Sequence, residues 1–230
     1  YGTYDTTSMH INEGGKASGT IIRHGKLYIY NGVVAESTTQ FAGTQTVLEG
    51  GLTNSTIVSG GTLDLAAGAS ATNVQINGFM TADYTADSYI TGTSNGKSIK
   101  VGDKEMNNLT IWNGRYMNVS EGWVASNTTI NANYLSYDTA SMFINKGGQA
   151  SGTVISHGIL HVKSGGYAEN TSQAAGSQII YNGGRASGGS VKGGTMFVAN
   201  GGTVKGTELR TEGTIILSAG AKAYDLVLSN

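Results

Sequence analysis

The chain lacks cysteine and proline, and it carries few charges for its length. Without cysteine, no disulfide and no thiolate metal site can stabilise the fold. Only 13% of the 230 residues are charged and the formal net charge is -1. A surface of this kind offers no basic stripe to neutralise phosphates, so we expect no nucleic-acid partner. The sequence also contains no apolar run of the length that a membrane-spanning helix needs.

Glycine, in contrast, is abundant, with 36 residues. Glycine at this frequency in a chain without proline excludes collagen and favours many tight corners. Valine, isoleucine and threonine are also frequent, and they alternate with polar residues as in strands that bury one face. No stretch shows a helical period. The composition and the pattern together predict an all-β fold.

The sequence repeats on a long scale. The segment SMHINEGGKASGTIIRHG, which starts at Ser8, recurs from Ser141 as SMFINKGGQASGTVISHG, an offset of 133 residues. The match extends over residues 4–68 and 137–201 without a gap. Such extended similarity at a fixed offset indicates an internal duplication.

A shorter repeat of 18 residues determines the predicted fold. Glycines at this spacing predict two tight corners per coil; the first series is Gly14, Gly32, Gly50 and Gly68, and the second is Gly25, Gly43 and Gly61. Inward apolar columns keep the same register, one through Met9, Leu27 and Leu63 and one through Ile11, Ile29, Val47 and Leu65. A chain that returns to its start in every coil stacks each strand on the next in parallel, about 4.8 Å apart. We therefore predict a right-handed parallel β-helix, a single solenoid over residues 1–230 with roughly eleven to twelve coils of about 18 residues.

Two segments depart from this repeat. The glycines fall out of phase after Gly68, and we expect irregular coils at about 79–115 with a loop near Ser94-Asn95-Gly96. The spacing from Gly122 to Gly147 is 25 residues, which is longer than one coil. An inserted loop is therefore expected at about 131–140.

The repeat unit resembles that of a known family. The segments HGKLYIYNGVVAESTTQ, GGTLDLAAGASATNVQI and GGTMFVANGGTVKGTEL resemble the AIDA-type repeats of bacterial autotransporter adhesins, and the resemblance covers nearly the whole chain. It implies a secreted passenger domain on the bacterial outer cell surface, with a role in self-association, biofilm formation or host-cell attachment and hence in virulence. It also implies identical copies of the chain as partners, a host receptor or glycan as further candidates, and glycosylation of Ser and Thr.

A carbohydrate-active enzyme on the same fold is the alternative. Enzymes of this architecture gather carboxylates on one face, whereas the fifteen acidic residues here are scattered. The sequence shows no Ser-His-Asp constellation, no calcium-binding repeat and no spacing of metal ligands around its four histidines. We therefore expect no enzymatic activity, no catalytic residue, no metal and no cofactor. A glycan-binding or glycan-degrading β-helix, or a phage-type fibre, remains the alternative function.

One outward column of side chains is unusually apolar and aromatic. With its flanking residues, it gives the candidate binding stripe: His10, Tyr28, Tyr30, Phe143, His161, Ile179, Tyr181 and Phe197. Apolar stripes with a polar rim mark interaction surfaces, and aromatic faces suit sugars or a second protein chain. The alternative is that the rings stack from coil to coil and only stiffen the solenoid.

Four glutamines occupy inward positions of the repeat: Gln40, Gln45, Gln173 and Gln178. A buried amide without a hydrogen bond costs roughly 1–3 kcal/mol. We therefore expect each pair to bond to itself or to backbone at the adjoining corner, Gly43 or Gly176.

Overall fold

The structure is a computed structural model that describes residues 7–132 and 139–229. It is a parallel β-solenoid of about 12 turns with coils of about 18 residues, which confirms the predicted fold class. The coils divide into two compact units, residues 1–102 and 103–230, and each is described by itself. The loop expected at about 131–140 falls mostly outside the described residues.

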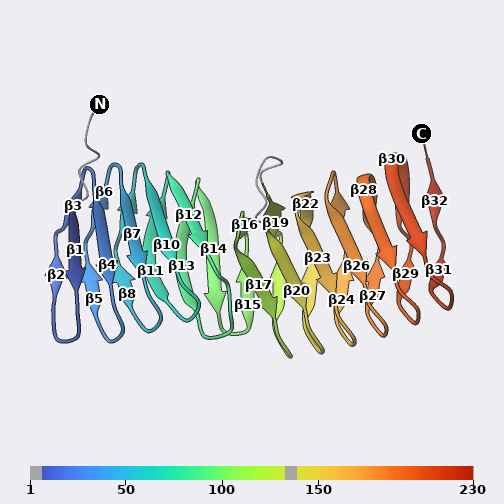
Figure 1. The fold of residues 1–230 in the computed structure, drawn as a ribbon, viewed down its shortest axis with the longest axis horizontal. Helices are drawn as coiled ribbons and strands as arrows, with labels where there is room; N and C mark the ends of the chain where they lie inside the picture. Colours follow the sequence, from blue (N-terminus) through green and yellow to red (C-terminus); the bar gives the residue numbers. More distant parts are fainter. Residues whose placement is uncertain (1–6, 133–138, 230) are drawn as a thin grey trace. The chain divides into compact units, whose positions relative to one another are not determined.

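In the first unit the strands of successive coils lie side by side in parallel (Figure 1). One side of the coil consists of β1 (Ser8–Ile11), β4 (Lys26–Ile29), β7 (Thr44–Val47), β10 (Thr62–Leu65) and β12 (Phe79–Ala82). A second side consists of β2 (Ala17–Ser18), β5 (Val34–Glu36), β8 (Leu52–Asn54), β11 (Ser70–Ile76) and β13 (Tyr89–Ser94). The short strands β3 (Ile21–Ile22), β6 (Thr39–Gln40) and β9 (Ile57–Val58) form the third side.

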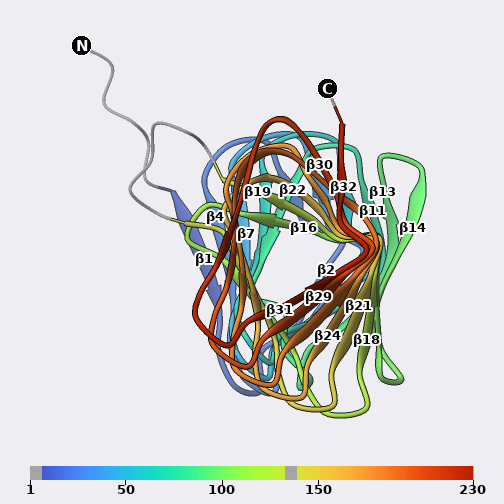
Figure 2. The same cartoon turned by 90° about the vertical axis from the view of Figure 1, so that its right-hand side faces the viewer.

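The second unit has the same three sides, and Figure 2 shows β18, β21, β24 and β29 lying over one another on one of them. This side consists of β15 (Glu105–Asn107), β18 (Val124–Ser126), β21 (Gln149–Ser151), β24 (Tyr167–Glu169), β27 (Arg185–Ser187), β29 (Thr203–Lys205) and β31 (Lys222–Tyr224). Another holds β17 (Tyr116–Val119), β20 (Ser141–Ile144), β23 (Ile159–Val162) and β26 (Ser177–Ile180). The third holds β16 (Thr110–Trp112), β19 (Thr129–Asn131), β22 (Val154–His157), β25 (Ser172–Gln173) and β32 (Val227–Leu228). The long strands β28 (Ser190–Val198) and β30 (Glu208–Leu217) run along the last two of these sides.

The 18-residue register places the apolar columns inside. Leu27 pairs with Met9 in one neighbouring coil and with Gln45 in the other. Leu27 and Ile29 are buried, whereas Lys26 is exposed, as the two-residue alternation of a strand requires. The prediction was wrong for Met9. This residue was expected to face inward, but its side chain is 47% exposed. Its strand β1 has a neighbouring strand on one side only within the described residues, so the side chain is covered from one side.

The predicted glycine corners are present. Gly32 has a φ of 71° and Gly43 a φ of 77°, a region that other residues rarely adopt. At Gly43 a Cβ atom would also collide with the carbonyl oxygen of Gly25 in the preceding coil. Stacking of corner upon corner therefore leaves no room for a side chain at this position.

The irregular segment contains an element that the 18-residue repeat did not predict. β13 and β14 (Lys97–Gly102) pair in antiparallel orientation, with Ser94 opposite Lys97. Asn95 and Gly96 have φ values of 48° and 77°, which is typical of the two-residue turn of a hairpin. The expected loop is thus a tight turn, and the parallel coil is interrupted here because an Asn-Gly pair reverses the chain direction.

All four glutamines point inward, as predicted, and each is at most 1% exposed. Nε2 of Gln40 donates to the carbonyl oxygen of Gly43 at 2.9 Å, and Nε2 of Gln173 donates to that of Gly176 at 3.1 Å, so these two bonds confirm the prediction.

The prediction was wrong for the other two amides. Nε2 of Gln45 donates to Oγ1 of Thr53 at 2.6 Å, on the next side of the coil. Neither polar atom of the Gln178 side chain has a hydrogen-bond partner among the described residues.

Candidate functional site

The stripe residues of the first unit form one compact cluster. His10 of β1 is in register with Tyr28 of β4, and their rings stack with centroids 4.6 Å apart and an interplanar angle of 17°. Nδ1 of His10 lies 3.0 Å from the hydroxyl of Tyr30, and its Nε2 lies 3.2 Å from Oγ of Ser8. The structure thus brings together all three residues that were predicted in this half.

The second unit contains a similar cluster. His161 stacks on Phe143 of the preceding coil, with centroids 4.5 Å apart and an interplanar angle of 9°. Its Nδ1 lies 3.0 Å from the hydroxyl of Tyr181. Nζ of Lys163 lies 3.8 Å from the ring centroid of Tyr181 and 5.7 Å from that of Phe143. A cation over aromatic faces is attracted by the ring quadrupole, so Lys163 is part of this cluster although it was not predicted as a site residue.

The environment of His161 favours its neutral form. Burial of the ring, and secondly the positive charge of Lys163, lower the pKa of His161 from 6.5 to about 4. At neutral pH the side chain is therefore an uncharged aromatic ring with one donor and one acceptor nitrogen.

The two clusters are not equivalent copies. The duplication relates His10 to Phe143 and Tyr28 to His161. In both units, however, the histidine bonds to a tyrosine 20 residues further along the chain. The same His-Tyr arrangement therefore occurs one coil later in the second half. Repeated geometry at different coils indicates that an outward His-Tyr pair with a ring beside it is a favourable way to cover this face.

The remaining two predicted residues, Ile179 and Phe197, lie beyond the second cluster. Ile179 of β26 is in register with Phe197 of β28, which is in register with Ile216 of β30. Phe197 is 37% exposed and Ile216 is 46% exposed. These three side chains form an outward column that we call the apolar patch. Ile216 was not predicted, although it continues the same column.

A groove beside a glycine corner was also missed. It has a volume of about 530 Å³ and is lined by residues of three successive coils: Gln149, Gly165, Gly166, Tyr167, Gly183 and Arg185. The 18-residue spacing of Gln149, Tyr167 and Arg185 could have indicated this outward column. The predicted aromatic stripe lies on another side of the coil.

Within the described residues, no group of three or more histidine, aspartate and glutamate side chains is placed to hold a metal ion. The same part of the chain includes no helix with the length and apolarity to cross a membrane.

No family model matches the chain, and neither does any curated protein sequence. Among solved structures, the chain is similar to a crystal structure of a TibC-catalysed, hyper-glycosylated fragment of TibA. The TM-score is 0.47 and the sequence identity 23%, over 97% of this chain and 85% of that chain. A match of this strength identifies neither a family nor a function.

Proposed function

We propose that this chain is a bacterial cell-surface adhesin domain that associates with identical copies of itself through the outward face of its solenoid. The apolar patch of Ile179, Phe197 and Ile216 carries the proposal. Apolar side chains that recur coil after coil on an outward strand face have no role in the core, and such patches mark interaction surfaces. The resemblance of the repeat units to adhesin repeats supports the same function.

The chemistry of the surface favours a second copy as the partner. With a net charge of -1, copies of the chain repel one another only weakly. A strand face with the same spacing in every coil can meet its counterpart on another copy over several coils at once. A two-fold pairing of this kind buries the same patch on both copies.

The stacked clusters have a different role from the patch. The rings of Phe143 and His161 cover each other, which stabilises neighbouring strands without any partner. The ring of Phe197, in contrast, stacks on no other ring among the described residues. We therefore assign self-association to the patch and stiffening of the sheet to the clusters.

The duplication supplies the variant that tests this proposal. The residues equivalent to Ile179 and Phe197 in the first half are Thr46 and Asp64. The double substitution Ile179→Thr and Phe197→Asp therefore introduces residues that the same positions already hold in this fold. We expect it to weaken self-association about tenfold or more, which corresponds to 1.4 kcal/mol.

Self-association is measured by sedimentation equilibrium and by aggregation of beads that carry the chain, with thermal unfolding recorded beside it. Val124→Thr is the control, because it removes an exposed apolar side chain of β18 on another side of the coil. A wild-type chain that stays monomeric, or a double variant that associates as strongly as the wild type, would overturn the proposal.

A further inference from the structure

The groove beside the glycine corner has the form of a ligand site. Its volume of about 530 Å³ is within the range of roughly 300–1,000 Å³ that small-molecule sites occupy. Its glycine wall is forced by the stacking of the coils, since a Cβ atom on Gly166 would collide with the carbonyl oxygen of Ile144. Gly165 and Gly183, the other two glycines of the wall, are exposed and present backbone instead of side chains to the groove.

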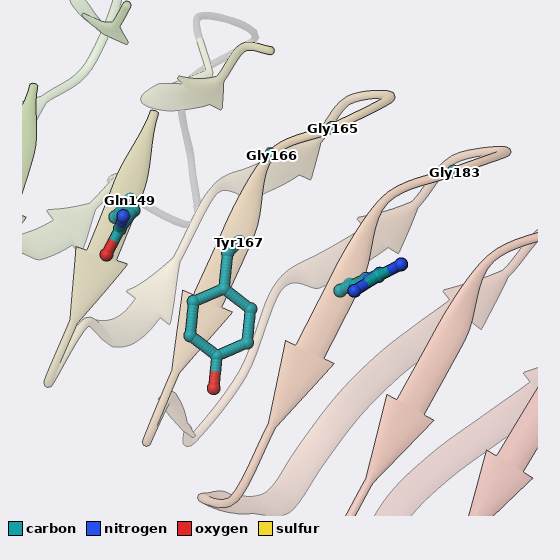
Figure 3. Close-up of a pocket in the computed structure, with 6 residues that line it drawn as sticks. Gln149, Gly165, Gly166, Tyr167 and Gly183 are labelled. Atoms are coloured by element: carbon teal, nitrogen blue, oxygen red, sulfur yellow. The ribbon is translucent and has the colours of Figure 1, made fainter. Parts of the chain in front are cut away.

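Three side chains of different chemistry form the other wall. Gln149, Tyr167 and Arg185 are in register on β21, β24 and β27, one per coil. None of the three side chains makes a hydrogen bond or an ion pair with another described residue. Figure 3 shows the ring of Tyr167 along its strand with its flat face turned to the viewer, and Gln149 beside it on the neighbouring strand. An aromatic face, an amide and a guanidinium are therefore all available to one ligand.

We propose that this groove binds an anionic saccharide, that is, a sugar chain that carries a carboxylate. The face of Tyr167 suits the apolar face of a sugar ring. The guanidinium of Arg185 presents a planar fork that matches a carboxylate with two parallel hydrogen bonds. The amide of Gln149 both donates and accepts, as sugar hydroxyls require. Three coils at about 4.8 Å each space these groups along a line, which fits a short oligosaccharide.

The first half contains a groove at a related corner, and its lining has no aromatic ring and no guanidinium. There the corner of Gly14 and Gly32 adjoins a groove of about 340 Å³. The duplication places Val34 and Leu52 at the positions of Tyr167 and Arg185. Val34 and Leu52 are in register just as Tyr167 and Arg185 are. The backbone therefore accepts both pairs. Val34 lines the first-half groove together with Lys16 and Glu36, whereas Leu52 is not part of its lining. Of these two grooves, only that of the second half is lined by an aromatic ring and a guanidinium.

This difference defines a test on the full chain. Binding of a tetrasaccharide of hexuronic acid is measured by titration calorimetry, with the corresponding neutral hexose tetrasaccharide as the comparison ligand. We expect saturable binding of the uronate at one site per chain. Tyr167→Val together with Arg185→Leu should weaken it at least about tenfold, the effect of one lost charge-assisted hydrogen bond, with an unchanged melting temperature. Arg185→Lys keeps the charge but loses the fork, and it should also weaken binding.

The reverse exchange, Val34→Tyr with Leu52→Arg, should raise the stoichiometry from one site to two. Equal binding of the neutral sugar would overturn the proposal, and so would full affinity in the Tyr167→Val, Arg185→Leu variant. No saturable uronate binding to the wild type would overturn it as well. The groove lies on another side of the coil from the apolar patch, so these outcomes are independent of the proposed self-association.

Discussion

Replacing Gln178 with leucine should stabilise the protein, although the residue lies in the core. Gln178 is 1% exposed, and both of its polar atoms lack a hydrogen-bond partner among the described residues. Its equivalent in the first half, Gln45, donates to the hydroxyl of Thr53. The residue equivalent to Thr53 in the second half is Ala186. The partner of the amide has therefore been replaced by a methyl group, and the amide remains without one.

The magnitude follows from the difference between the two glutamines. Gln178 leaves an amide nitrogen and an amide oxygen without a partner, whereas Gln45 leaves only its oxygen. A buried amide without hydrogen bonds costs roughly 1–3 kcal/mol. Leucine also fits the column, because Gln178 is in register with Leu160 and Met196. We expect Gln178→Leu to raise the free energy of unfolding by about 1–3 kcal/mol, which for 150–250 residues corresponds to roughly 2–4 °C per kcal/mol in melting temperature.

Gln45→Leu is the matched control, because it makes the same chemical change at the equivalent position. It removes one unsatisfied oxygen but also breaks the bond to Thr53, so its stability should be at least about 1 kcal/mol below that of Gln178→Leu. Both variants are compared by urea unfolding and by calorimetry. Ala186→Thr, which restores the missing hydroxyl, should also stabilise the wild-type chain but not Gln178→Leu. Equal effects of the two leucine substitutions, or a destabilised Gln178→Leu, would refute this reasoning.

Three further outcomes are expected. Because the folded pKa of His161 lies below its ordinary value, the unfolded chain binds more protons between pH 6.5 and about 4, and stability should fall across this window as pH is lowered. Solvent screening limits this loss of stability to about 1 kcal/mol. The variant His161→Tyr, which introduces the residue found at the equivalent position 28, should remove this pH dependence in urea titrations at several pH values. Thr171→Val should raise stability by about 1 kcal/mol in the same assay, because the buried hydroxyl of Thr171 has no partner in the described chain; a loss would contradict this. Asn95→Ala should lower the free energy of unfolding by about 1 kcal/mol, because alanine is strained at the positive φ of this position. Hydrogen exchange should then show faster opening of β13 and β14, and unchanged protection of these strands would contradict the prediction.

The features that follow from the 18-residue period could be predicted from the sequence. The 18-residue spacing determines which residues face inward, so the buried column through Leu27 and Ile29 and the glycine corners could be predicted position by position. The hairpin at Asn95-Gly96 was missed because a local turn preference prevails there over the repeat. The partners of Gln45 and Gln178 were missed for another reason. They depend on one residue on the next side of the coil, and the repeat does not determine its identity.

For the candidate site, periodicity predicted the column but not the contacts within it. Spacing alone placed His10 beside Tyr28 and Phe143 beside His161. It did not predict the position of Nζ of Lys163 over Tyr181, since this depends on how a flexible side chain covers exposed rings. That the stripe binds a partner remains a prediction.

A comparison of equivalent residues in the two halves distinguishes positions that the fold requires from positions that can acquire a function. Many inward and corner positions keep their residue in both halves, as Ala35 and Ala168 do, although buried Thr53 corresponds to Ala186. Outward positions differ in chemistry between the halves: polar Thr46 corresponds to Ile179, and Val34 corresponds to Tyr167. The fold accepts either residue at each of these sites, so stability does not require the choice made in the second half. On a solvated strand face an added isoleucine gains only contact with its cross-strand neighbours unless something else covers it. The apolar patch and the groove lined by Tyr167 and Arg185 both lie in the second half, so the two proposals place their binding surfaces at positions whose residues the fold does not determine.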